Sequence, residues 1–436
     1  MSLTSFFTRS GQAKTASALQ ELRRLCYRLL SEAGTANSAA IAAQVVDAYG
    51  KCPPESRVAF FEFLNSELAP DIQQVLKAAK AYADKQDAER VLDLQRVVEP
   101  PRQELVRRIN RAPGGTAAIL EMRRDLLKVL ADHPGLRAVD SDFRHLLTSW
   151  FNPGFLNLQQ VDWNSPAALL EKIILQEAVH AINNWAELRR RLQPDRRCFA
   201  FFHPQLPGEP LIFVEVALLT AIPKSIEQLI GEGVHRQPSS APHVAAFYSI
   251  NNCEPGLRGV SLGNFLIKRV AQQLRVEMPT LKRFCTLSPI SGLRPWLTAV
   301  DVAALPEEWP ARLRARFSSA VTALRSRYGA DLDALSAAAA NRSLPADDQA
   351  RLAQCAAVFL TRISVTPHGD AIARFHLDNG ARLERLNVNA DLSAKGLRES
   401  FGVMVNYVYD LGAIEANHER FVRGEVVCSS QIAVTI

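Results

Sequence analysis

The residues whose spacing most clearly suggests chemistry lie between Gly256 and Gly292, in and after the run GLRGVSLGNFLIKRVAQQL. An apolar run, Val244–Ile250, precedes this segment, and a second one, Phe284–Leu287, ends it near Ser288. A strand, a glycine-containing loop that opens a helix, and a second strand would form a phosphate-binding βαβ unit. Free backbone N–H groups at a helix N-terminus favour an anion, and the helix dipole adds to this preference. We therefore expect a phosphorylated carrier as the ligand.

Three single residues are further candidates, and each also has a structural interpretation. Ser288 stands where the second strand ends, and the proline after it removes a backbone donor, so the pair could be a strand-ending turn. His376 lies in RFHLDNGA, where we expect a strand over Ala371–Leu377 and an imidazole on the opposite face from its neighbours. Tyr409 ends the alternating run VMVNYVY and could be an ordinary core tyrosine.

Several other chemistries are not supported. The histidines form neither HExxH nor a Cys/His cluster with metal-ligand spacing, and no GxSxG run indicates a hydrolase nucleophile. The loop from Gly259 to Gly263 matches neither Walker A nor GxGxxG. The seven cysteines are scattered, odd in number and without a CxxC pair, which argues against a disulfide framework and for a reducing compartment.

Length and composition favour a globular protein of two domains. The chain has 436 residues, of which 47% are hydrophobic and 22% charged, so it can bury a sizeable core. Its net charge of +6 fits an enzyme of anionic substrates as well as a nucleic-acid binder, but no nucleic-acid motif with interleaved aromatics is present. The N-terminal residues lack a signal-peptide core, and no segment approaches the ~20 apolar residues that span a bilayer. We expect a cytoplasmic protein with no membrane or nucleic-acid partner.

The first part of the chain, up to about residue 190, is predicted to be almost entirely helical. Apolar residues repeat at helical spacing in Ala16–Leu30, Val58–Leu68 and Leu120–Leu130. Breaks between helices are expected at the prolines and glycines of four short segments: residues 53–54, 70, 100–101 and 113–115.

From about Pro194 the pattern becomes mixed α/β. Strands are predicted over five further segments, and Cys198–His203 with Leu211–Leu219 should form a hairpin. A short helix is expected over Ser225–Ile230, and residues 305–362 should be helical again. The other strands are predicted at Val244–Ile250, Phe284–Leu287, Ala371–Leu377, Arg382–Val388 and Val403–Tyr409.

Taken together, the sequence resembles the malonyl-CoA decarboxylase family. The resemblance extends over nearly the whole chain, and its blocks stand in the same order: SWFNPGFLNLQQVDWNSP, EAVHAINNWAELRRRL, HPQLPGEPL, FYSINNCEPGLRGVSLGNFLIKRV, TLSPISG, RFHLDNGARL and MVNYVY. It implies an all-α helical oligomerisation domain over residues 1–190. It also implies an α/β catalytic domain of the GNAT (acyl-CoA N-acyltransferase-like) fold, with a mixed sheet, over residues 191–436.

In the GNAT fold, the loop before the central helix holds the CoA pyrophosphate, and the pantetheine arm lies between the strands that flank that helix. The resemblance places pantetheine between residues 246–250 and 285–288, and it implies catalytic roles for Ser288, His376 and Tyr409. The loop departs from the usual Gln/Arg-x-x-Gly-x-Gly pattern, and its Ser261 stands where animal relatives carry a glutamate. CoA would be bound by Arg258, Gly259, Val260, Ser261, Leu262, Gly263 and Asn264.

The family implies that malonyl-CoA is converted to acetyl-CoA and carbon dioxide. No metal, biotin or pyridoxal cofactor is needed, because the thioester itself accepts the electron pair as an enolate. Ser288 would orient the malonyl group, and His376, with a pKa near neutrality, would steady that group and protonate the α-carbon. A homotetramer or homodimer is expected by analogy.

Two other functions are alternatives. A GNAT-type acyltransferase would use the same CoA-binding loop to acetylate an amine and would release free CoA. A non-catalytic CoA-binding scaffold would bind the ligand without turnover and would be indifferent to changes at Ser288 and His376.

Overall fold

The computed structural model describes residues 3–31, 37–231, 241–366 and 369–435. Contacts within the chain divide it into two units. The first unit contains Met1–Asn157, Phe201–Leu211 and Asn252–Leu262. The second contains Leu158–Ala200, Ile212–Asn251 and Gly263–Ile436. The predicted order, a helical part followed by a mixed α/β part, is confirmed.

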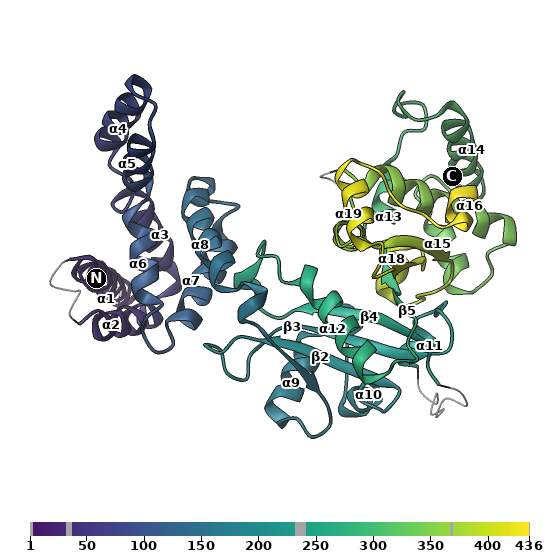
Figure 1. The fold of residues 1–436 in the computed structure, drawn as a ribbon, viewed down its shortest axis with the longest axis horizontal. Helices are drawn as coiled ribbons and strands as arrows, with labels where there is room; N and C mark the ends of the chain where they lie inside the picture. The colour runs from purple at the N-terminus through teal and green to yellow at the C-terminus, as the bar shows by residue number, and fades with distance from the viewer. Residues whose placement is uncertain (1–2, 32–36, 232–240, 367–368, 436) are drawn as a thin grey trace. The chain divides into compact units, whose positions relative to one another are not determined.

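The first unit is built mainly from helices, drawn purple to blue in Figure 1. Pro54 and Pro101 lie in the first turns of α3 and α6, where the N–H that proline lacks has no helical partner anyway. The predicted breaks are therefore confirmed. Large side chains such as Phe60, Phe61 and Phe143 fill the core. The helices are α1 (Leu3–Leu30), α2 (Ser38–Lys51), α3 (Pro54–Ser66), α4 (Ile72–Asp84), α5 (Ala88–Val98), α6 (Pro101–Ile109), α7 (Gly115–Val129) and α8 (Arg137–Trp150).

The pair α4 and α5 differs from the other helices of this unit. The two helices pack against each other, and none of their residues is buried. Both begin with an aspartate whose side chain accepts backbone N–H groups, Asp71 for α4 and Asp87 for α5. Several of their apolar side chains are exposed: Ile72, Leu76, Leu92 and Val98.

One strand lies where only helix was predicted. β1 (Asn157–Val161) is at one edge of the sheet beside β2, and within it only Val161 is buried. The run NLQQV lacks clear apolar alternation, so its extended form depends on pairing with β2, and local sequence could not reveal it.

The second unit is organised on a mixed sheet whose strand order is β1-β2-β3-β4-β5-β8-β6, with β7 paired to β8. The predicted neighbours β2 and β3 are adjacent. Except for the segment 371–377, the predicted strands are confirmed. Their bounds are β2 (Arg196–Phe202), β3 (Pro210–Leu219), β4 (Val244–Asn252), β5 (Arg283–Thr286), β6 (Ser288–Pro289), β7 (Arg382–Asn387) and β8 (Met404–Tyr409).

Helices precede and follow these strands in the sequence. The predicted helical stretch 305–362 contains three helices, α14 to α16, whose bounds follow, and a π-helical turn at Phe359–Ile363. The remaining helices are α9 (Ala167–Gln176), α10 (Trp185–Arg191), α11 (Glu227–Ile230), α12 (Gly263–Glu277), α13 (Leu293–Ala299), α14 (Ala311–Tyr328), α15 (Asp333–Ala340), α16 (Ala346–Val358), α17 (Ala371–Asp378), α18 (Ala394–Ser400), α19 (Ile414–Val422) and α20 (Ser430–Thr435).

The segment that carries His376 is a helix, so the predicted strand at 371–377 is wrong. Asp370 caps α17, because its carboxylate accepts the N–H of Ala373 at 2.8 Å. Ala373, His376 and Leu377 then fall at i, i+3 and i+4 and form the buried face of the helix. The imidazole therefore shares a face with its apolar neighbour Leu377.

The predicted βαβ unit is confirmed as β4–α12–β5. β4 and β5 are parallel, and their pairing ends at Phe247 opposite Thr286. β4 then continues to Asn252, whereas the segment after β5 continues into β6, which pairs with β8. Any opening between these strands must therefore begin beyond Phe247 and Thr286, and the predicted gap is wrong for residues 246–247 and 285–286, which lie in the paired part.

Candidate active site

The structure brings Ser288, His376 and Tyr409 together in one hydrogen-bonded chain inside the second unit. Ser288 Oγ lies 3.0 Å from His376 Nε2, and the other ring nitrogen, Nδ1, lies 2.7 Å from the Tyr409 hydroxyl. All three residues are buried. They come from β6, α17 and β8, so the sheet and one helix bring together side chains that are far apart in the sequence.

Two residues that the sequence analysis did not single out complete this site. The Ser288 hydroxyl donates to Thr286 Oγ1 at 2.9 Å, and the backbone N–H of Tyr407 donates to the same oxygen at 3.3 Å. The Tyr407 ring stacks on the His376 imidazole, with centroids 4.6 Å apart. Thr286 and Tyr407 thus hold the hydroxyl and the imidazole in place.

A sequence signal for both residues existed. Thr286 is two residues before Ser288, and Tyr407 is two residues before Tyr409, so each pair has the spacing of side chains on one face of a strand. The pairing of β8 with β5 and β6 keeps one register: Cys285 is opposite Val408, and Ser288 is opposite Val405. Ser288 is therefore the first residue of the short strand β6, which continues to Pro289, whereas the sequence predicted that a strand ends at Ser288.

The helix α17 is fixed against the segment that follows Ser288. The Asp370 carboxylate accepts the Ser291 hydroxyl at 2.8 Å and the N–H of Gly292 at 3.1 Å. The same carboxylate caps α17, so one buried side chain sets both the start of the helix and its position beside the loop. This arrangement fixes the His376 ring relative to Ser288.

The site is uncharged near neutral pH. Burial lowers the pKa of His376 to about 3, and burial raises the pKa of Tyr409 well above its usual value. The expected pKa near neutrality for His376 is therefore wrong. A neutral imidazole has one N–H and one acceptor nitrogen. Since the Ser288 hydroxyl donates to Thr286, a consistent arrangement has Tyr409 donating to Nδ1 and Nε2–H donating to Ser288.

The predicted CoA-binding residues lie on the segment that joins β4 to α12. Arg258, Gly259, Val260, Ser261 and Leu262 belong to the first unit, and Gly263 and Asn264 begin α12 in the second. Arg258 and Ser261 are exposed, whereas Val260 and Leu262 are buried. The side chain of Asn264 lies outside the described residues.

The segment before Arg258 is bound tightly to α7 within the first unit. The buried Arg123 donates to the carbonyl of Gly256 at 2.8 Å and pairs with Asp140 at 2.9 Å, and Arg124 pairs with Glu254 at 2.9 Å. Gly259 has φ +80, a conformation that glycine adopts without strain. The loop conformation is therefore held by helix contacts that no local motif indicated.

Gly263 has a packing role in the second unit. A Cβ at this position would lie 2.4 Å from the Phe375 ring, so only glycine allows the start of α12 to approach α17 this closely. Phe375 precedes His376, so the same contact helps to position the helix that carries the imidazole. A larger residue at Gly263 would disturb this packing as well as any ligand contact.

Among the residues that the structure describes, no group of three or more His, Cys, Asp or Glu side chains is placed to hold a metal ion. Within the same residues, no helix has the length and apolar character needed to cross a bilayer.

The fold and the site define a two-unit protein, helical and then α/β, whose α/β unit contains a buried and uncharged serine–histidine–tyrosine chain. Sequence comparison assigns a family to this architecture. Residues 154–436 match the malonyl-CoA decarboxylase C-terminal domain, and residues 68–151 match the malonyl-CoA decarboxylase N-terminal domain. The chain belongs to the malonyl-CoA decarboxylase family.

Individual relatives agree with this assignment. A mitochondrial malonyl-CoA decarboxylase from the goose Anser anser anser is 34% identical over 75% of this chain and 67% of its own length. The crystal structure of malonyl-CoA decarboxylase from Rhodopseudomonas palustris is 43% identical, covers 95% of this chain and 98% of its own, and has a TM-score of 0.79. The crystal structure of malonyl-CoA decarboxylase from Agrobacterium vitis is 42% identical, covers 95% of this chain and 99% of its own, and has a TM-score of 0.81.

Proposed function

We propose that this chain converts malonyl-CoA to acetyl-CoA and carbon dioxide, with Ser288 and His376 as the residues that orient the malonyl group. The observation that carries the proposal is the buried contact of 3.0 Å between Ser288 Oγ and His376 Nε2 in a member of this family. Tyr409 supports the imidazole from its other nitrogen, 2.7 Å away.

In the proposed reaction the bond between the α-carbon and the carboxylate carbon breaks. Carbon dioxide leaves, and the electron pair moves into the thioester carbonyl to give an enolate. One proton taken up by the α-carbon then completes acetyl-CoA. Negative charge develops on the thioester oxygen, so preorganised donors at that oxygen stabilise the transition state, and removing one costs roughly 3–4 kcal/mol in comparable sites. The Ser288 hydroxyl and the Nε2–H group are the donors we assign, and when substrate binds they exchange their present acceptors, Thr286 Oγ1 and Ser288 Oγ, for the thioester oxygen.

The neutral state of His376 refines this mechanism. A histidine whose pKa is about 3 does not carry a stored proton at pH 7, so protonation of the α-carbon must draw on a donor that is replenished. The chain from the Tyr409 hydroxyl through the imidazole to Ser288 provides such a route, because each group can donate and accept in turn. A dry, uncharged site also strengthens every hydrogen bond to the forming enolate.

We further propose that the segment from Arg258 to Asn264 binds the CoA pyrophosphate. Arg258 and Ser261 are exposed, and no side-chain hydrogen bond or ion pair joins either of them to another described residue, so both are available to a ligand. No cofactor is required in this proposal, because the thioester supplies the electron sink.

The helical unit is proposed to form a homotetramer or homodimer through α4 and α5. These helices bury no residue of their own and expose Ile72, Leu76, Leu92 and Val98, which is the pattern of an apolar face that a second copy could cover. Leu76→Glu and Leu92→Glu should lower the mass measured by light scattering, whereas the charge change Arg111→Glu, at an exposed residue outside α4 and α5, should not. An unchanged mass in the two leucine variants would contradict this interface.

A cytoplasmic location also stays a proposal, supported by the free state of all seven cysteines. Fractionation of the source cells with an antibody to the chain would test it.

The product distinguishes the proposed reaction from acyl transfer and from simple binding. Purified protein is incubated with malonyl-CoA, and both thioesters are followed by mass while carbon dioxide is trapped. The proposal predicts acetyl-CoA and carbon dioxide in equal amounts. Free CoA with an acylated acceptor, or unchanged malonyl-CoA, would contradict it.

A further inference from the structure

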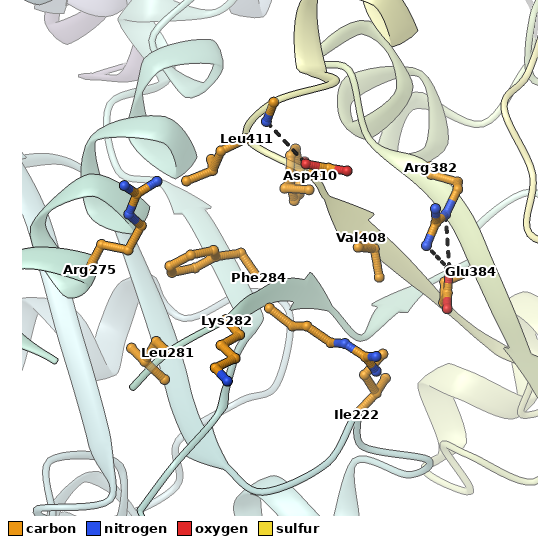
Figure 2. Close-up of a pocket in the computed structure, with 13 residues that line it drawn as sticks. Ile222, Arg275, Leu281, Lys282, Phe284, Arg382, Glu384, Val408, Asp410 and Leu411 are labelled. Atoms are coloured by element: carbon orange, nitrogen blue, oxygen red, sulfur yellow. Dashed lines mark hydrogen bonds and ion pairs between the residues drawn. The ribbon is translucent and has the colours of Figure 1, made fainter. Parts of the chain in front are cut away.

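A cationic pocket lies in the second unit at the end of α12 far from Gly263. Its cavity of ≈ 530 Å³ lies within the size range of small-molecule sites. Figure 2 shows Arg275 of α12 on one side of it and the Arg382–Glu384 pair of β7 on the other. A second cavity of ≈ 560 Å³ adjoins it and shares Ile222, Lys282, Arg283 and Glu384.

The charge of the first pocket is strongly positive. Arg275, Lys282 and Arg283 are exposed, and no side-chain hydrogen bond or ion pair joins them to any other described residue. Arg382 is compensated by Glu384, to which it donates at 2.7 Å. With Asp410 as the remaining acid, three cations face one carboxylate, an excess of two positive charges. That excess matches a phosphate monoester, which carries ≈ −1.5 to −2 at pH 7.

The walls between these charges are apolar. Ile222, Leu281, Phe284, Val408 and Leu411 line the same cavity, and Figure 2 shows Phe284 and Val408 between charged side chains. Such a lining favours an organic group attached to the anion, because burying apolar surface adds to the electrostatic attraction. Inorganic phosphate would leave these walls in contact with water.

The pocket is separate from the segment proposed to bind the CoA pyrophosphate. Arg275 is twelve residues beyond Gly263 on α12, which corresponds to roughly 18 Å at the helical rise per residue. The pocket also includes Lys282 and Arg283, which lie at the start of β5, whereas the pyrophosphate segment follows β4. Within the second unit, Gly263 and the pocket therefore lie at opposite ends of α12.

We propose that this pocket is a second anion site that binds a small organic phosphate, with Arg275, Lys282 and Arg283 as the cations that attract the phosphoryl group and the apolar side chains around its organic part. Guanidinium groups suit phosphate because they donate two parallel hydrogen bonds. Tyr409 also lines the cavity, so the ligand would lie beside the strand that carries part of the candidate active site.

Calorimetry on the full chain at low salt tests the proposal with three probes: phenyl phosphate, phenol and inorganic phosphate. We expect phenyl phosphate to bind at least about tenfold more tightly than either phenol or inorganic phosphate. Its affinity should fall as salt is added. Equal affinity for inorganic phosphate would overturn the organic-phosphate assignment, and equal affinity for phenol would overturn the anion site.

Variants then locate the binding. Arg275→Ala and Arg283→Ala should each lower the affinity for phenyl phosphate by about tenfold. Arg269→Ala removes an exposed cation from the same helix outside the pocket and should change the affinity less than about twofold, as should Arg258→Ala in the pyrophosphate segment. Loss of binding in Arg258→Ala with unchanged binding in the two pocket variants would overturn the proposal. Melting temperatures of the variants control for folding.

Discussion

Two polar sites of opposite character share residues of strand β8. One is the buried chain of Ser288, His376 and Tyr409, which is uncharged near neutral pH. The other is the exposed cationic pocket that includes Arg283 and Asp410. The contrast assigns bond-breaking chemistry to the dry, neutral site, where hydrogen bonds to a forming enolate are strong, and recognition of phosphate to the wet, charged one.

The largest expected effect comes from removing the buried donors. Ser288→Ala and His376→Asn should each lower kcat for carbon dioxide release by about 10² to 10⁴, because each change removes a donor at the reacting group. Initial rates at saturating malonyl-CoA measure this effect, and circular dichroism confirms folding. A folded variant that keeps wild-type turnover would remove that residue from the mechanism.

Acid should weaken the second unit through His376. The folded pKa of about 3 lies below the ordinary histidine value, so the unfolded chain takes up a proton first. The neutral imidazole therefore makes its full contribution to the free energy of unfolding above about pH 6.5. That contribution falls by about 1.4 kcal/mol per pH unit as the pH drops toward 3.

Urea unfolding of the wild type and His376→Asn at pH 7, 5.5 and 4.5 measures this loss. The free-energy difference between the two proteins should shrink as the pH falls. A difference that is constant with pH would show that the imidazole is not held neutral by burial.

A smaller effect is expected at Thr286, which positions Ser288. Thr286→Val keeps the shape of the side chain but removes the oxygen that accepts from Ser288 and from the Tyr407 N–H. We expect kcat to fall about tenfold with little change in KM, and the stability to fall by about 1–2 kcal/mol because a buried donor loses its partner. Thr286→Ser should keep most of the wild-type kcat and stability, because it retains the hydroxyl oxygen. If Thr286→Ser were as impaired as Thr286→Val, the effect would come from the change in the methyl group rather than from the lost oxygen.

The smallest effect should come from the exposed cation of the pyrophosphate segment. Arg258→Ala should raise KM for malonyl-CoA by about three- to tenfold and leave kcat nearly unchanged, because the CoA phosphates are bound equally in the ground and transition states. Steady-state kinetics at two salt concentrations measures both constants. A fall in kcat alone would contradict the assignment.

The sequence predicted those parts of the fold that depend on local pattern. Proline positions predicted the helix breaks at Pro54 and Pro101, and alternating apolar residues predicted β8. It failed for α17, because AIARFHL has apolar residues compatible with both periods, and the decisive feature is the cap made by Asp370. An aspartate before an alanine-rich run is a helix-start signal that could have been used.

The candidate site was predictable only in part. The family resemblance named Ser288, His376 and Tyr409, but their contacts depend on long-range pairing of β6 with β8 and on α17. The neutral state of His376 could not be predicted, since burial of that ring is a property of the folded unit. Nor could the sequence show that Gly263 is needed for contact with Phe375.

The most direct test of the central claim is a crystal structure of this protein with acetyl-CoA bound. We expect the acetyl carbonyl oxygen to lie within hydrogen-bond distance of Ser288 Oγ or His376 Nε2. An acetyl group located elsewhere, with Ser288 Oγ and His376 Nε2 still hydrogen-bonded to each other and Ser288 Oγ still hydrogen-bonded to Thr286, would contradict the proposed mechanism.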